Sequence, residues 1–241
     1  LRDGQPGTDA CDKLTREEPA HEVELSAFFI DRHEVRNADY ARWLEGLGEL
    51  TRTAHELGAR IERSGTPLVV VASERAGIAV EGGRFTAVAG EEDTPVRYVS
   101  WHGAQQYCLD LGKRLPTEAE WERAARGVSR RSFPWGEEPP RCDGVVFARY
   151  RDMVCAHLPH GPARVGGSSA DVTPEGVHDL AGNVREWVQD PFVERYAPCD
   201  PVCRDPGRAP PAPASRHAIR GGGWLQPAVL SRAARRAGDE P

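Results

Sequence analysis

Residues 178–187, which read HDLAGNVREW, bring two carboxylates close to a tight turn. Asp179 and Glu186 stand on either side of Gly182 and Asn183. Carboxylates and the backbone carbonyls between them are the hard oxygen ligands that Ca²⁺ takes in sets of six to eight. The spacing therefore predicts a calcium site. The alternative is that the two carboxylates only cap the turn by accepting hydrogen bonds from its amides, while the tryptophan that follows packs in the core.

The cysteines are the second group able to do chemistry. There are six of them: Cys11, Cys108, Cys142, Cys155, Cys199 and Cys203. We expect the disulfides Cys199–Cys203 and Cys142–Cys155, each closing an irregular stretch, which leaves Cys11–Cys108 as the third pair. Zinc is the alternative, but neither CDPVC nor CAHLPH, with His157 and His160, has the spacing of a structural zinc site. Paired thiols predict an extracytoplasmic protein, whether periplasmic, lipoprotein-anchored or secreted.

Composition narrows the class of protein. The chain has 241 residues with 31 Lys and Arg against 37 Asp and Glu, a net charge of −6, and no basic stripe with interleaved aromatics. Nucleic acid is therefore not an expected partner. The longest apolar run, PLVVVA at residues 67–72, is far shorter than the roughly 20 residues that a membrane span requires. We expect one domain, and a start at Leu1 in which a leader has been removed or the first residues are missing.

Three helices are predicted from their start and stop signals. They cover residues 37–47, 100–111 and 117–127. Asn37 is the expected N-cap of the first helix and Ser100 that of the second, and Thr117 with Glu120 forms the capping box of the third. A glycine, Gly48, Gly112 or Gly127, stands at the end of each helix, as is typical of a helix end.

Strands are predicted by alternation and by β-branched runs. The alternating stretch HEVELSAFFID at residues 21–31 predicts a half-buried strand, and residues 67–90 predict short strands or a hairpin broken at Gly82-Gly83. The segment HAIRGGGW at residues 217–224 is again strand-like. Between residues 134 and 177 no periodicity is visible, which is typical of a functional or cross-linked loop.

Five motifs in this chain resemble, in order and spacing, the formylglycine-generating enzyme or sulfatase-modifying factor family. They are FFIDRHEVRNADYARWL, PVRYVSWHGAQQYCLDLGKRLPTEAEWERAARG, PWG, HDLAGNVREWVQD and IRGGGW…SRAARR. The resemblance runs from about Glu22 to Arg236. It implies an α+β, C-type-lectin-like fold that is low in regular structure, with two main helices packed on small antiparallel sheets and long loops. We expect an N-terminal arm at residues 1–21 and a single family domain at residues 22–241, with both ends shorter than in relatives.

The same resemblance sharpens the expected metal chemistry. In relatives the matching positions bind calcium through the side chains at Asp179 and Glu186 and through the carbonyls at Gly182 and Val184. Formylglycine-generating enzymes also hold copper through two cysteines just after their RGGS segment. Here Gln226 stands at the first of those positions and Ser231 or a neighbour at the second, and no cysteine follows Cys203. Cu(I) prefers soft thiolates, so neither copper nor aldehyde-generating activity is expected. The H-x3-H-x-E sequence of the iron-dependent branch is also absent, so iron is not expected.

These observations lead to two hypotheses of different classes. The first is a degenerate, calcium-stabilised binding or accessory domain, with an unknown protein or small-molecule ligand in the family groove. The residues expected in that groove are Trp224, Gln226, Arg232 and Arg235. The second is an oxidoreductase that modifies a peptide or small thiol through other metal ligands. A hydrolase or transferase is not favoured, because the sequence shows no nucleophile–base pattern.

Overall fold

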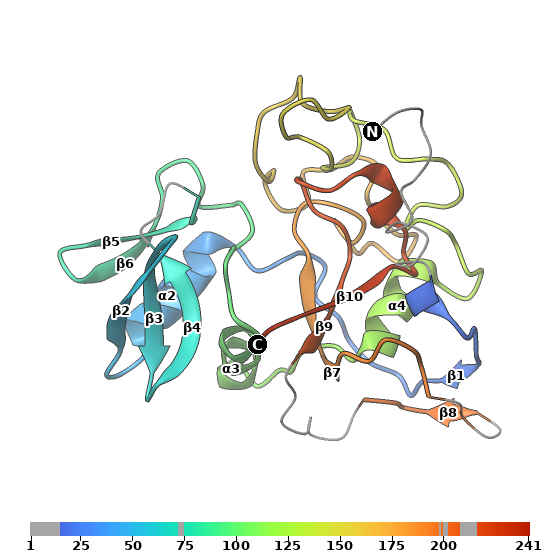
Figure 1. The fold of residues 1–241 in the computed structure, drawn as a ribbon, viewed down its shortest axis with the longest axis horizontal. Coiled ribbons are helices and arrows are strands. Elements are labelled where there is room, and N and C mark those ends of the chain that lie inside the picture. The colour runs from blue at the N-terminus through green and yellow to red at the C-terminus, as the bar shows by residue number, and fades with distance from the viewer. Residues whose placement is uncertain (1–14, 72–74, 198, 200–201, 208–215) are drawn as a thin grey trace.

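The computed structural model describes residues 15–71, 75–197, 199, 202–207 and 216–241. It has two lobes that meet at the helix α3 (Trp101–Asp110) (Figure 1). One lobe contains α2 (Asn37–Gly46) and the strands β2 (Thr51–His55), β3 (Gly58–Arg63), β4 (Thr66–Val71), β5 (Ile78–Glu81) and β6 (Arg84–Ala87). The other contains α4 (Glu118–Arg126) and the strands β7 (Glu186–Pro191), β9 (His217–Arg220) and β10 (Arg236–Asp239). The remaining short elements are η1 (Thr15–Glu17), β1 (Val23–Glu24), β8 (Cys203–Arg204) and η2 (Ala228–Ser231).

The sheets are small, and all but one are antiparallel. Their strand orders are β2-β3-β4, β5-β6 and β10-β9-β7, while β1 and β8 form a two-residue parallel pair. In the third sheet Arg220 of β9 lies opposite Glu186 of β7 on one side and Arg236 of β10 on the other. This α+β architecture with long loops confirms the predicted fold class.

Two of the three helices begin where their caps predict. The prediction of Asn37 as the cap of α2 was wrong, because Asn37 is the first helical residue and Arg36, at the N-cap position, makes no side-chain cap. The Ser100 side chain accepts a hydrogen bond from the Gly103 amide (2.9 Å) at the start of α3. The Thr117 side chain accepts from the Glu120 amide (3.2 Å), and the Glu120 carboxylate accepts from the Thr117 amide (2.9 Å). Such a cap contributes about 1 kcal/mol to helix stability. All three predicted helices are therefore confirmed to within a residue or two.

Two of the strand predictions need correction. Of the strand predicted over residues 21–31, only Val23–Glu24 pairs, and the rest of that segment is extended but has no strand partner among the described residues. Conversely, β2 and β3 were not predicted. Residues 51–55 show no alternation of apolar residues, and in β3 the alternation is limited to Ala59 and Ile61. The hairpin β5–β6, which turns at Gly82-Gly83, is confirmed.

The core is divided among three clusters. One joins α2 to β3 and β4 around Leu44 and Ile61, and a second surrounds the fully buried Trp121 of α4. A third lies in the long irregular loop around Phe147 and Cys155. The long loop of the third cluster is also cross-linked by the disulfide Cys142–Cys155.

Two of the three predicted disulfides are present, Cys142–Cys155 and Cys199–Cys203. Cys108 carries a free thiol, so the prediction of a Cys11–Cys108 disulfide was wrong at Cys108. Cys11 itself lies outside the described residues, as do residues 1–14 of the predicted N-terminal arm. The Cys108 thiol is half-buried, and burial raises its pKa to about 11.

Candidate functional site

The loop at residues 179–186 connects the irregular part of the chain to β7. Asp179 and Asn183 adopt left-handed backbone conformations, with φ of 61° and 62°, and both side chains are fully buried. At Gly182 an added Cβ would lie 2.6 Å from the Val146 carbonyl oxygen, so only glycine fits there. The loop is thus a fixed turn with buried polar side chains.

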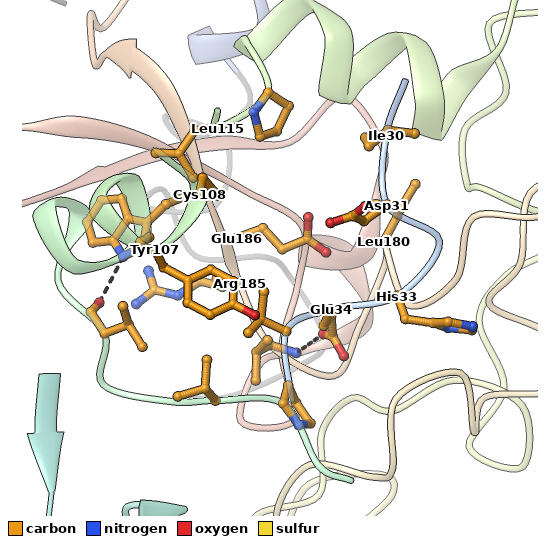
Figure 2. Close-up of a pocket in the computed structure, with 18 of the residues that line it drawn as sticks. Ile30, Asp31, His33, Glu34, Tyr107, Cys108, Leu115, Leu180, Arg185 and Glu186 are labelled. Carbon is orange, nitrogen blue, oxygen red and sulfur yellow. Dashed lines mark hydrogen bonds between the residues drawn. The ribbon is translucent and has the colours of Figure 1, made fainter. Parts of the chain in front are cut away.

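Glu34 holds one side of this loop, from a segment about 150 residues earlier in the chain. Its carboxylate accepts hydrogen bonds from the Val184 amide (3.2 Å) and from the Asn183 side-chain amide (2.6 Å). Glu34 and Glu186, both labelled in Figure 2, line the cavity described below. The sequence analysis did not identify Glu34. The only signal in the sequence was an acidic residue at the end of the FFIDRHEV motif.

Asp171 holds the other side. Both of its carboxylate oxygens accept from the Ala181 amide, at 3.2 and 3.0 Å. Amides of the turn are therefore bound by Asp171 and Glu34, two acids that the sequence analysis missed. The sequence analysis offered the alternative that Asp179 and Glu186 cap the turn. The hydrogen bonds to the amides of the turn come from Asp171 and Glu34 instead.

The two predicted acids make contacts outside the turn. Oδ2 of Asp179 accepts from the Gly166 amide (2.5 Å). Oδ1 of the same carboxylate is buried and makes no hydrogen bond, although the Ser168 hydroxyl lies close enough to offset part of the rise that burial causes in the pKa of Asp179. Oε2 of Glu186 accepts from the indole N–H of Trp121 (2.7 Å). A buried carboxylate oxygen without a partner is costly, because it has lost water and gained no donor. A cation beside Asp179 would remove that cost.

Electrostatics supports the same interpretation. Burial, with a smaller repulsion from Asp179, raises the pKa of Glu186 to about 7. Burial likewise raises the pKa of Asp179, and burial together with repulsion from both predicted acids raises the pKa of Glu34 and Asp171 well above their usual ranges. The four carboxylates therefore destabilise one another when all are ionised, and a bound cation would reverse this effect.

Side chains alone do not complete a metal site here. Among the described residues, no three His, Cys, Asp or Glu side chains converge closely enough to hold a metal ion. A calcium ion at this loop would need main-chain oxygens, such as the predicted carbonyls of Gly182 and Val184, in addition to carboxylates. Calcium is suited to such a mixed set, since carbonyls and waters commonly complete its coordination.

A cavity of about 1040 Å³ lies beside the loop (Figure 2). Its wall comes from the extended segment 27–35, from α3, from β7 and β9, and from the chain after Gly222. Aromatic residues in the wall include Phe28, Tyr107, Trp187 and Trp224. The Trp187 indole is held by a hydrogen bond to the Val99 carbonyl (2.9 Å). Figure 2 labels Tyr107, Cys108 and Arg185 around this space together with Glu34, and all four line the cavity.

The structure separates the four predicted groove residues. Trp224 and Gln226 line the cavity, whereas Arg232 and Arg235 are not among the residues that line it. Arg232 instead forms an ion pair with Glu17, with N–O distances of 3.0 and 2.5 Å. Arg235 is buried, with 7% of its surface exposed. The cavity that Trp224 and Gln226 line therefore does not include the two arginines that were expected beside them.

The family resemblance implies copper-binding thiols at Gln226 and at Ser231 or a neighbour, and both of these residues present unpartnered oxygens instead. Oε1 of Gln226 and Oγ of Ser231 are both buried, and neither has a hydrogen-bond partner. An amide oxygen and a hydroxyl are hard, weak ligands, unlike the soft thiolates that hold Cu(I). Gln226 does, however, present a hydrogen-bond acceptor at the cavity wall.

The structure describes no helix with the length and apolar character that crossing a bilayer demands.

Fold and loop together define a class: small antiparallel sheets and capped helices that hold an acidic, glycine-containing turn beside a cavity. Residues 4–241 match the family model described as "Sulfatase-modifying factor enzyme 1-like domain". The chain belongs to this family.

Relatives at about one-third identity have different names. The formylglycine-generating enzyme of Streptomyces coelicolor is 32% identical over 239 residues, which cover 87% of this chain and 71% of that protein. The serine/threonine-protein kinase pkn1 of Chlamydia caviae is 32% identical over 216 residues, covering 86% of this chain but 30% of the kinase. The chain thus spans less than a third of that kinase. Among solved structures, PvdO from Pseudomonas aeruginosa has a TM-score of 0.60 at 24% identity, covering 87% of this chain and 73% of PvdO, which shows the shared fold.

Proposed function

We propose that this chain is a non-catalytic member of its family, a binding or accessory domain whose ligand occupies the cavity. One observation carries the proposal: Gln226, at the position where the family resemblance implies a copper-binding thiolate, has a buried oxygen without a partner and lines the cavity. Cys108 is the one free thiol in the described part of the chain that faces the same cavity, and a single thiolate does not make a linear or trigonal Cu(I) site.

The ligand that fits this cavity is largely apolar with a few polar groups. The aromatic wall offers stacking and apolar contact, and the Gln226 oxygen offers an acceptor for a ligand N–H or O–H. A volume of about 1040 Å³ accommodates either a small molecule or a short stretch of a protein partner. Burial of the apolar part would drive binding, while the polar groups would select among ligands.

Calcium is the structural cofactor of the proposal. The carboxylates of Asp179 and Glu186 and the carbonyls of Gly182 and Val184 would hold the ion. Three observations support this: Asp179 has an unpartnered buried oxygen, burial and repulsion raise the pKa values of the acids, and Glu34 and Asp171 already bind amides of the turn. The ion would fix the loop that forms one wall of the cavity.

An extracytoplasmic location is part of the same proposal. Cys142–Cys155 and Cys199–Cys203 are compatible with an oxidising compartment, where such disulfides persist. The kinase and aldehyde-generating activities that the relatives' names state belong to proteins with more chain or other residues. We therefore assign neither activity to this domain.

Catalysis and binding can be separated by one experiment. The protein is loaded with one equivalent of Cu(I) and mixed with a cysteine-containing peptide under oxygen, with the Streptomyces coelicolor formylglycine-generating enzyme as positive control. We expect no peptide aldehyde by mass spectrometry and no oxygen consumption above background. Copper-dependent conversion of the peptide would overturn the proposal and favour the oxidoreductase hypothesis.

A further inference from the structure

Arg235, just before β10, is a buried arginine without an acid. Only 7% of its surface is exposed, and two of its three guanidinium nitrogens, Nε and Nη1, are buried without a hydrogen-bond partner. Its backbone amide donates to the Arg232 carbonyl (3.0 Å), which fixes the turn that carries the side chain. No ion pair to Arg235 occurs in the described part of the chain, although guanidinium groups inside proteins are normally paired.

Each neighbouring arginine has its own carboxylate. The pairs are Arg16–Glu194 (2.7 Å), Arg185–Asp239 (3.4 Å), Arg220–Glu122 (2.6 Å) and Arg232–Glu17 (2.5 Å). Glu17 is the acid that could otherwise serve Arg235, but both of its oxygens are taken by Arg232. One positive charge in this cluster is therefore left without compensation.

The surroundings oppose that charge. Burial, followed by repulsion from Arg185, Arg220 and Arg16, lowers the pKa of Arg235 to about 10. The side chain is still protonated at neutral pH, so the folded protein holds an uncompensated cation. A buried ion of this kind is stabilised only when a counter-charge with matching hydrogen-bond geometry is supplied.

We propose that Arg235 is the anchor of a binding site for one carboxylate group, separate from the calcium loop and from the residues that line the cavity. A carboxylate fits because its two oxygens match the planar guanidinium and because it brings a single negative charge. Phosphate or sulfate would bring a second charge that the already paired neighbours do not need. The inference goes beyond the proposed function and does not depend on it.

The carboxylate could be a free small acid or an acidic side chain of a peptide, and two probes distinguish these sources. Acetate tests the free acid, and a short glutamate-containing peptide blocked at both termini tests the side chain. Binding is measured by the shift of the thermal unfolding midpoint in Tris-chloride at constant ionic strength, with sodium sulfate and phosphate as comparison anions.

Arg235→Met is the diagnostic variant, because it keeps the length of the side chain and removes the charge. We expect R235M to unfold at least about 3 °C above the wild type in the absence of carboxylates, because an uncompensated buried charge has been removed. We expect acetate or the peptide to raise the midpoint of the wild type, and R235M to weaken the affinity by on the order of tenfold or more.

Arg97→Met is the matched control. Arg97 is similarly buried, at 8% exposure, but it is paired with Glu91 (2.5 Å). R97M should lower the midpoint and leave the response to carboxylates unchanged. The proposal is overturned if neither probe shifts the wild type, if R235M responds as the wild type does, or if sulfate or phosphate binds more tightly than both carboxylates.

Discussion

Replacing Glu186 with glutamine should have opposite effects in the presence and absence of calcium. Glutamine keeps an oxygen that accepts from the Trp121 indole N–H, which the glutamate binds at 2.7 Å, and it removes the negative charge. Without calcium the charge destabilises the folded protein, because it is buried and repelled by Asp179. With calcium bound, the same charge is a ligand. E186Q should therefore be more stable than the wild type in a chelator and less stable in calcium.

The size of the first effect follows from the pKa of Glu186, which rises from 4.5 to about 7 in the folded protein. A raised carboxyl pKa means that the folded state holds its proton more tightly than the unfolded state. At pH 4 Glu186 is protonated in the folded protein and costs no stability. Above pH 7 it is ionised, and its buried charge lowers the free energy of unfolding by about 3 kcal/mol. At pH 8 in a chelator, E186Q should recover much of this amount, which corresponds to roughly 6 °C or more for a chain of this length.

The size of the second effect follows from binding linkage. At a calcium concentration 100 times the dissociation constant, the ion stabilises the wild type by about 2.7 kcal/mol. E186Q lacks one charged ligand, so most of this gain should be lost. Thermal unfolding by circular dichroism, in EGTA and in calcium at pH 8, measures both effects in one series.

Glu122→Gln provides the control for the in-depth prediction. Glu122 is a glutamate of α4 paired with Arg220 and Arg126, both at 2.6 Å. E122Q should destabilise the protein equally with and without calcium. The reasoning about Glu186 is refuted if E186Q is destabilised in the chelator as well, or if it retains the calcium response of the wild type.

Other perturbations should have effects that the structure also sets. Reduction of Cys142–Cys155, with a sequence separation of 13, should cost about 3 kcal/mol in the free energy of unfolding, as measured by urea denaturation with and without reductant; no change in midpoint would contradict this. Burial, then repulsion from Glu118, raises the pKa of Asp190 to about 6, so the free energy of unfolding should fall by up to about 3 kcal/mol as the pH rises from 4 to 7. D190N should remove that part of the slope, and an unchanged pH profile would refute it. Glu118 accepts from Arg236 at 2.7 and 2.8 Å in a buried pair, so E118Q should cost about 3–5 kcal/mol by the same denaturation assay, and a loss below 1 kcal/mol would argue against a buried pair.

The sequence correctly predicted interactions between residues that are close to one another in the chain. Ser100 and Thr117 cap their helices through contacts with residues three positions away, and these contacts form as expected. The short-range disulfides Cys142–Cys155 and Cys199–Cys203 also form. In each case the partners are close in sequence, so little other structure is needed to bring them together.

Long-range contacts were not visible in the sequence. Glu34 binds the loop at residues 179–186 from about 150 positions away, and nothing in its local pattern distinguishes it from a surface acid. The strand expected over residues 21–31 has the right alternation, but pairing requires a neighbouring strand that alternation alone does not supply. The arginines after η2 were grouped by proximity in sequence, while Arg232 turned out to be committed to Glu17.

The central claim, a calcium-stabilised domain without a redox metal, is tested most directly by elemental analysis. The protein is purified without chelators or a histidine tag, and its metals are quantified by plasma mass spectrometry against protein concentration. The account predicts about one calcium per chain, no stoichiometric copper or iron, and loss of the calcium in a variant that combines Asp179→Asn with Glu186→Gln. Stoichiometric copper or iron, or a wild type without calcium, would contradict it.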